Sequence, residues 1–132
     1  MFKETEKENN MPLTNEYPIT IPKGKICSWY ATAQTASSKT IELYSPKNML
    51  VFKTSINSRE LDNFGIGSFT ASEGGEYILK FPDSKDVKTT HAEIVSDSYA
   101  TVCSTHIFGG EDAGDADYQD VFLTLTIYLK KG

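Results

Sequence analysis

Residues 121–129 alternate strictly between two kinds of side chain, and this pattern constrains the fold more than any other feature of the sequence. Aliphatic residues occupy every second position, and Phe, Thr or Tyr occupies the positions between them (VFLTLTIYL). A period of two places successive side chains on opposite faces of an extended strand. We therefore expect the aliphatic face in a core, and the Phe, Thr and Tyr face at the surface or at a subunit interface.

Eight further runs of β-prone residues precede this strand. The expected strands cover residues 17–21, 25–33, 40–44, 49–54, 64–70, 76–81, 91–95, 99–107 and 121–129. Turn-forming clusters lie between many of them, at residues 22–24 (PKG), 45–48 (SPKN), 72–75 (SEGG) and 82–84 (PDS). Many short strands at such intervals, with no convincing helix, are typical of a sandwich. The sequence predicts an all-β fold, an antiparallel Greek-key β-sandwich of about nine strands.

The chain of 132 residues fits a single domain behind a polar arm. Residues 1–16 are charged and carry few core-forming side chains, so we predict an N-terminal arm there and the sandwich over residues 17–132. The sequence contains no apolar run of about 18 residues and no apolar stretch typical of a signal peptide near its start. We expect a chain that is made in the cytoplasm, does not insert into membranes and, if exported, needs no signal peptide.

Charge and reactive residues argue against several functions. The 13 basic and 18 acidic residues give a formal net charge of -5, which disfavours nucleic acid as a partner. Cys27 and Cys103 lack C-x-x-C spacing, so buried free thiols are favoured over a disulfide. His91 and His106 are expected at a strand surface or core edge, because nothing pairs them with an activated serine or an orienting acid. We predict no catalytic residues and no enzymatic activity.

Five carboxylates lie within the ten residues from Glu111 to Asp120 (EDAGDADYQD). A solvated acidic turn is the simpler interpretation of such a run, but its pattern favours calcium. Asp115, Asp117 and Gln119 place side-chain oxygens at every second position, directly before Asp120, and calcium prefers many oxygen ligands. Three glycines in and before the run permit a tight loop. The run contains neither Cys nor His, so zinc and copper are poor fits. EF-hand spacing does not fit, because Asp120 falls where that loop needs glycine.

This run resembles the motif of the bacterial two-calcium lectins that bind fucose and mannose. The segment GGEDAGDADYQD, followed by an alternating strand and a terminal glycine, is similar to that family's GSEDGTDNDYND motif. A second similarity covers residues 19–22 (ITIP) and 34–37 (QTAS), where the family has a strand entry, an asparagine ligand and a sugar-specificity loop. Residues 45–90 are similar only in strand-like character.

The resemblance implies a site with two calcium ions and one sugar. It assigns calcium ligation to Gln34, Glu111, Asp115, Asp117, Gln119, Asp120 and Gly132. It assigns sugar contacts to Thr35, Ala36, Ser37, Asp112 and Gly114. In that family vicinal sugar hydroxyls bridge the two ions, and the carboxylate of the last glycine reaches into the site of the partner subunit.

The sequence departs from the family pattern at both amide ligands. Gln34 and Gln119 stand where the family has asparagine, and the last strand is two residues longer. The resemblance implies a lectin that recognises fucose, mannose or a glycan carrying them, and that forms a homodimer or higher homo-oligomer. The alternative is a calcium-stabilised structural or adhesion β-domain that binds no sugar.

Overall fold

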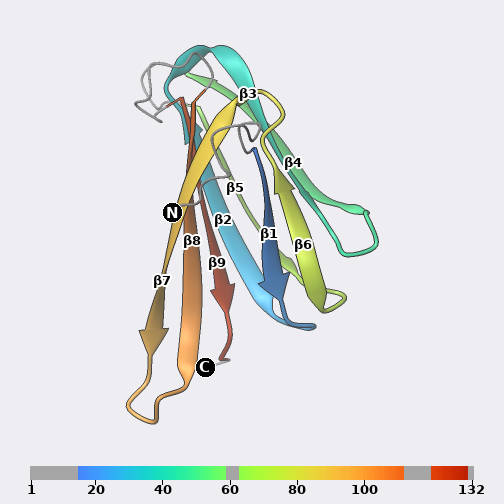
Figure 1. The fold of residues 1–132 in the computed structure, drawn as a ribbon, viewed down its shortest axis with the longest axis vertical. Helices are drawn as coiled ribbons and strands as arrows, with labels where there is room; N and C mark the ends of the chain where they lie inside the picture. The colour runs from blue at the N-terminus through green and yellow to red at the C-terminus, as the bar shows by residue number, and fades with distance from the viewer. Residues whose placement is uncertain (1–14, 59–62, 112–119, 131–132) are drawn as a thin grey trace, which may run out of the picture.

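Two antiparallel sheets form the protein (Figure 1). The computed structural model describes residues 15–58, 63–111 and 120–130. Its strands are β1 (Glu16–Ile21), β2 (Ile26–Ala33), β3 (Thr35–Tyr44), β4 (Leu50–Ser58), β5 (Phe64–Thr70), β6 (Gly75–Lys80), β7 (Asp86–Val95), β8 (Thr101–Glu111) and β9 (Val121–Tyr128). One sheet has the order β1-β6-β3-β4 and the other β5-β2-β9-β8-β7. The predicted all-β sandwich of nine strands is confirmed.

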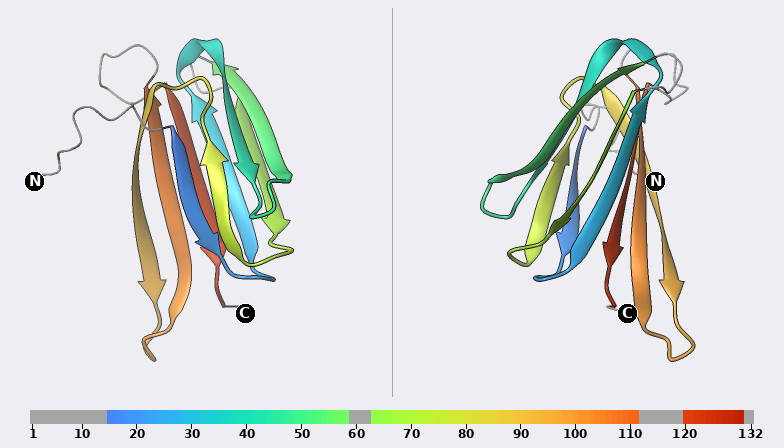
Figure 2. Two further views of the ribbon diagram at one scale, coloured as in Figure 1. Left: turned by 45° about the vertical axis from the view of Figure 1, so that its right-hand side comes forward. Right: turned by 180° about the vertical axis from the view of Figure 1, so that it is seen from behind.

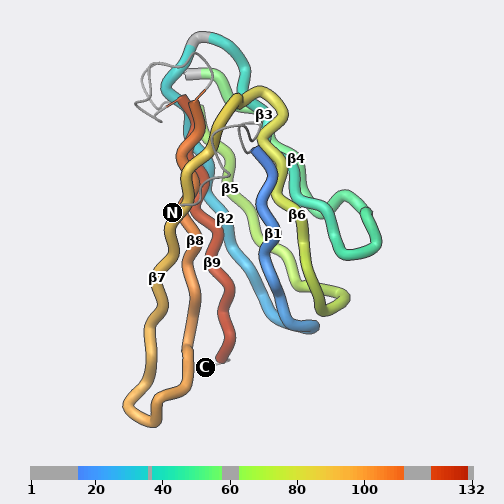
Figure 3. The backbone as a smooth tube through the Cα atoms, viewed as in Figure 1, coloured from blue at the N-terminus to red at the C-terminus, as the bar shows by residue number. Residues whose placement is uncertain are grey.

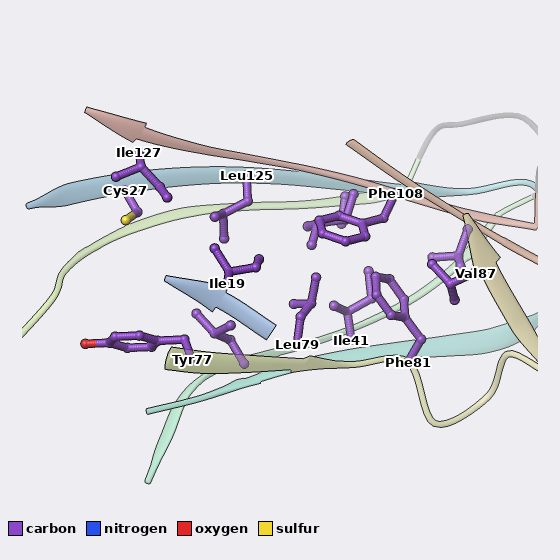
Figure 4. Close-up of a cluster of buried hydrophobic side chains, with 14 of the residues drawn as sticks. Ile19, Cys27, Ile41, Tyr77, Leu79, Phe81, Val87, Phe108, Leu125 and Ile127 are labelled. Atoms are coloured by element: carbon purple, nitrogen blue, oxygen red, sulfur yellow. The ribbon is translucent and has the colours of Figure 1, made fainter. Parts of the chain in front are cut away.

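Apolar side chains from alternate positions of the two sheets fill the space between them. The aliphatic residues of β9 from Val121 to Ile127 are buried, whereas Phe122 and Tyr128 are exposed. Figure 4 shows Leu125 on the five-stranded sheet facing the side chains of the other sheet. Each such aliphatic side chain stabilises the fold by about 1.5–3 kcal/mol relative to an exposed one. The face predicted for the core is therefore the face that the fold buries.

An aromatic contact between β2 and β4 also joins the two sheets. The ring of Trp29 on β2 stacks on Phe52 of β4, with centroids 4.2 Å apart and planes 10° apart. Gly67 of β5 is the cross-strand partner of Trp29. A Cβ atom added to Gly67 would lie 2.8 Å from the indole ring, so only glycine leaves room for this stacking.

Strands β7 and β8 form a long hairpin that the opposite sheet covers only in part (Figure 2). Val87 is buried, but every residue of β7 from Lys88 to Val95 is exposed. The hairpin reaches farther from the common core than the other strands in both views of Figure 2. No helix within the described ranges is long and apolar enough to cross a membrane.

Four predicted strand boundaries were wrong by four or five residues. β3 begins at Thr35 rather than at residue 40, and β4 ends at Ser58 rather than 54. β7 begins at Asp86 rather than 91, and β8 ends at Glu111 rather than 107. These added residues are mostly polar or glycine. Backbone pairing with a neighbouring strand extends the sheet there without the alternating apolar residues that sequence patterns detect.

Candidate functional site

One edge of the five-stranded sheet gathers the predicted ligands that the structure describes. β2 ends at Ala33 and β8 at Glu111, whereas β9 begins at Val121. Because β9 is antiparallel to both neighbours, the ends of β2 and β8 lie beside the start of β9 (Figure 3). Gln34, Glu111 and Asp120 are therefore brought together at this edge.

Backbone hydrogen bonds hold Asp120 between the two neighbouring strands. Its N–H donates to the carbonyl of Gly110 over 3.1 Å, and its own carbonyl accepts the N–H of Gln34 over 3.1 Å. The carbonyl of Glu111 accepts the N–H of Lys85 over 2.8 Å, which ties the end of β8 to the segment before β7. The main chain thus fixes the positions of all three predicted ligands.

Three acidic residues follow one another across this edge. Asp86 on β7 is the cross-strand partner of Glu111 on β8. Asp120 lies on the other side of β8, because the next residue, Val121, pairs with Gly110. Glu111 is buried, and the other two are half-buried. Carboxylate oxygens are ligands that calcium prefers. The sequence did not predict Asp86, because only the register of β7 on β8 places it here.

The described part of this edge does not form a complete metal site. No three His, Cys, Asp or Glu side chains of residues 15–58, 63–111 and 120–130 are close enough to hold a metal ion. The predicted ligands Asp115, Asp117, Gln119 and Gly132 lie outside the described residues. Their role stays a prediction, and the oxygen donors of Gln34, Glu111 and Asp120 fit calcium as a partial set.

The predicted sugar-contact segment lies beside Gln34, at the start of β3. The register of β3 on β4 shifts between Thr35 and Lys39, so this part of the strand is irregular. The hydroxyls of Thr35 and Ser37 are 3.1 Å apart and hydrogen-bonded, and the N–H of Ser37 donates to Thr35 Oγ1 over 3.3 Å. The segment therefore presents two neighbouring hydroxyls next to the acidic edge. The side chain of Ala36, and both Asp112 and Gly114, lie outside the described residues.

The two histidines of the chain lie together on the hairpin, away from the acidic edge. His91 and His106 are cross-strand partners whose ring centroids are 5.5 Å apart, with planes 23° apart. Ser104 Oγ lies 3.3 Å from His106 Nε2. Burial, followed by the charge of His91, lowers the pKa of His106, and the charge of Glu93 acts in the opposite direction. Their expected locations are confirmed, since His91 is exposed and His106 half-buried.

Both cysteines are free thiols, as predicted. Cys27 is buried in the core, whereas Cys103 is only half-buried, which corrects the expectation that both are buried. Cys103 lies on the face of β8 that points away from the core, where it is the partner of Tyr128.

Comparison with known proteins identifies the family. The family model of fucose-binding lectin II (PA-IIL) matches residues 19–129, which is most of the chain. The protein belongs to the fucose-binding lectin II family. The match includes Gln34, Glu111 and Asp120, so the acidic edge lies within the part that the family shares. No curated protein matches the chain in sequence.

Solved lectins share the fold of this fucose-binding lectin II protein. A high-affinity mannose-binding lectin of Ralstonia solanacearum has a TM-score of 0.64 and 19% identity, over 87% of this chain and 96% of that one. A Chromobacterium violaceum lectin in complex with alpha-methyl-fucoside has a TM-score of 0.64 and 17% identity, over the same shares, 87% and 96%. The C-terminal domain of a Burkholderia cenocepacia lectin has a TM-score of 0.62 and 17% identity, over 92% and 100%. The family and the fold are those of lectins rather than enzymes.

Proposed function

We propose that the protein is a calcium-dependent lectin that binds fucose- or mannose-type monosaccharides through two calcium ions at the acidic edge. The observation that carries this proposal is the convergence of Gln34, Glu111 and Asp120 from three separate segments, with backbone hydrogen bonds on both sides of Asp120. Membership of the fucose-binding lectin II family supports a sugar as the ligand.

The ligands proposed for calcium are the seven that the sequence resemblance assigns. Glu111 and Asp120 supply charge at the ends of their strands, and Gln34 supplies a neutral amide oxygen. The fixed backbone at Asp120 reduces the ordering that ion binding requires. Bound calcium would offer open coordination positions to the hydroxyls of a sugar. Thr35 and Ser37 then provide hydroxyl groups for direct hydrogen bonds at the rim of the site.

Calorimetric titration tests this proposal directly. Methyl fucoside and methyl mannoside are titrated into the protein with excess calcium and again with excess chelator. We expect binding only with calcium. A melting temperature that rises with calcium, without any heat from either sugar, would instead support the structural or adhesion domain.

Two charge-neutralising variants localise the site. Asp120→Asn removes one proposed ligand charge, and we expect calcium affinity to fall by roughly tenfold or more, which corresponds to about 1.4 kcal/mol. Asp97→Asn removes an exposed carboxylate at the tip of the β7–β8 hairpin and is expected to bind calcium normally. Equal calcium affinity in the two variants would contradict the assignment of Asp120.

The proposal includes a homodimer, and the outer face of the five-stranded sheet supports it. This outer five-stranded face consists of every second residue over 64–70, 26–32, 122–128, 103–109 and 88–94. Cross-strand pairs join these residues into four continuous rows across β5, β2, β9, β8 and β7. Lys88, at one corner, is the only charged residue among them. Several large apolar side chains of the face are exposed, namely Ile26, Tyr30, Phe64, Ile66, Ile94, Ile107, Phe122 and Tyr128.

The outer side of the four-stranded sheet is charged, so the lack of charge is specific to the five-stranded sheet. On the outer side of the four-stranded sheet, Glu42 has Lys53 and Lys80 as cross-strand partners, and Lys80 is also the partner of Glu16. The outer five-stranded face measures roughly 600 Å² from ordinary strand spacing and rise. With its protruding side chains it approaches the roughly 800 Å² that each partner of a stable complex buries. A second copy of the chain is the partner that best matches such a neutral face.

A further inference from the structure

A groove of about 380 Å³ separates the β7–β8 hairpin from the edge strand β1. Pro18 and Thr20 line it on the β1 side, His91 and His106 on the hairpin side, and Ile127 lies between them. Glu93 is the only acidic residue lining this groove, and no Lys or Arg lines it. The groove is therefore a mildly negative site that contains both imidazoles of the chain.

The spacing of the two rings suits a shared metal ion. Two imidazoles that bind one ion at about 2.0–2.1 Å per nitrogen hold their ring centres roughly 5–6 Å apart. The centroids of His91 and His106 are 5.5 Å apart. Their planes are nearly parallel, and the nitrogen lone pairs lie in these planes. Each ring must therefore rotate about its bond to Cβ before both nitrogens face one ion, and this torsion is broad in histidine. Because the two residues are cross-strand partners, the backbone already holds them at this spacing.

The surroundings also favour a cation over a proton. Partial burial, and then the charge of His91, lowers the pKa of His106, which favours the uncharged ring and leaves one ring nitrogen with a lone pair. Glu93 pairs across the hairpin with Ser104, next to the histidine pair, and its charge reaches His106. A carboxylate beside the two imidazoles attracts a divalent cation without needing to bind it directly.

We propose that His91 and His106 form a second metal site that takes a late first-row divalent ion such as Ni²⁺, Cu²⁺ or Zn²⁺, independently of the acidic edge. Imidazole is a ligand that these ions prefer and that calcium avoids, so the two sites differ in the metal they select. The described residues supply two ligands, and water fills the remaining positions.

Nickel titration of the full chain tests the site. The protein carries no polyhistidine tag and is kept in excess calcium, so that the acidic residues near Asp120 do not compete for nickel. We expect one Ni²⁺ per chain. His91→Gln and His106→Gln should each weaken nickel binding by roughly tenfold or more, because one nitrogen ligand is lost. Nickel affinity that is unchanged in either variant would overturn the proposal.

Two matched variants separate the electrostatic contribution from ligation. Glu93→Gln removes the charge in the groove and should weaken nickel binding about two- to fivefold, as expected for a partly exposed charge. Asp97→Asn removes a carboxylate from the same hairpin outside the groove and should leave nickel binding unchanged. Equal effects of these two variants would contradict the proposed location.

A spectroscopic measurement on the unmodified protein guards against loss of folding in the variants. The chain has only two histidines, so its imidazole proton resonances report this pair alone. Paramagnetic Ni²⁺ at less than one equivalent should broaden the resonances of both rings together. Broadening of one ring without the other, or of neither, would exclude a shared ion.

Discussion

Gly110 shows how a single residue shapes the edge that carries the proposed calcium site. A Cβ atom at this position would lie 2.5 Å from Val121 Cγ1 and 2.8 Å from Ser84 Oγ. The carbonyl of Gly110 also accepts the N–H of Asp120. Close packing and ligand positioning therefore depend on the same small residue.

We predict that Gly110→Ala lowers both stability and calcium affinity. Overpacking of this kind typically costs about 1–3 kcal/mol, and the shift of the backbone should move Asp120. Gly67→Ala, which crowds Trp29 at a distance from the edge, is the matched control. Denaturant titration should show a loss of stability in both variants, and calorimetry should show weaker calcium binding in Gly110→Ala alone. Normal calcium affinity in Gly110→Ala would contradict this interpretation.

Cys27 illustrates how burial controls the reactivity of a side chain. Burial raises the pKa of its thiol from 9.0 to about 12. We predict that iodoacetamide labels Cys103 in the native monomer much faster than Cys27, because the thiolate is the reactive form. Mass spectrometry of digested samples measures both rates. Comparable labelling of the two cysteines below pH 9 would contradict the buried position of Cys27.

The raised pKa of Cys27 makes the free energy of unfolding depend on pH in the alkaline range. The unfolded chain loses the Cys27 proton near pH 9, whereas the folded chain keeps it until about pH 12. The contribution of Cys27 to stability is therefore complete below pH 9 and is lost as the pH rises toward 12. Replacing Cys27 by Ala should reduce this part of the decline in the free energy of unfolding.

Single residues at the site could be predicted only where a local pattern marks them. Glu111 and Asp120 belong to a dense acidic run, whereas Gln34 was assigned by the resemblance of residues 34–37 to the two-calcium lectins. Asp86 and the histidine pair have no such signal, because their positions depend on the register of β7 on β8. That register follows from the turn near Asp97, and a one-residue error there would exchange the faces of the strand.

At the scale of strands, the pattern of β9 gave a nearly exact prediction because one face is buried and the other is not. Its predicted and observed ranges differ by a single residue. β7 was predicted five residues too short because the missed residues, 86–90 (DVKTT), are mostly polar. β8 was predicted too short because its last residues include two glycines, which usually indicate a loop. Burial on one face is not the only useful signal, because β5 was predicted exactly although none of its residues is buried.

At the scale of the whole molecule, the two sheets have different outer surfaces. The four-stranded sheet exposes charged pairs such as Lys53 and Glu42, whose charged atoms are 3.7 Å apart. The outer five-stranded face is nearly free of charge. The sequence pattern of β9 left open whether its Phe, Thr and Tyr face is surface or interface, and the other four strands supply the comparison that favours an interface.

We predict that Ile66→Lys converts a dimer of this protein into monomers. Ile66 lies on the outer five-stranded face and is 69% exposed. In a two-fold symmetric dimer each copy would place its new charge in an apolar contact, at a cost of several kcal/mol. Light scattering coupled to size-exclusion chromatography measures the mass. Thr20→Lys adds the same charge on the outer side of β1 and should leave the dimer intact; a dimer that survives Ile66→Lys would exclude this face.

The stacked pair of Trp29 and Phe52 makes the protein convenient to follow in solution. Trp29 is the only tryptophan of the chain, and its ring rests on a side chain of the opposite sheet. Trp29 is also four residues from the end of β2, where the acidic edge lies, and this corresponds to about 13 Å at the usual rise of a strand. Its emission spectrum should therefore change when the two layers separate and remain insensitive to occupancy of the acidic edge. A native optical reporter thus follows unfolding without interference from ligand binding.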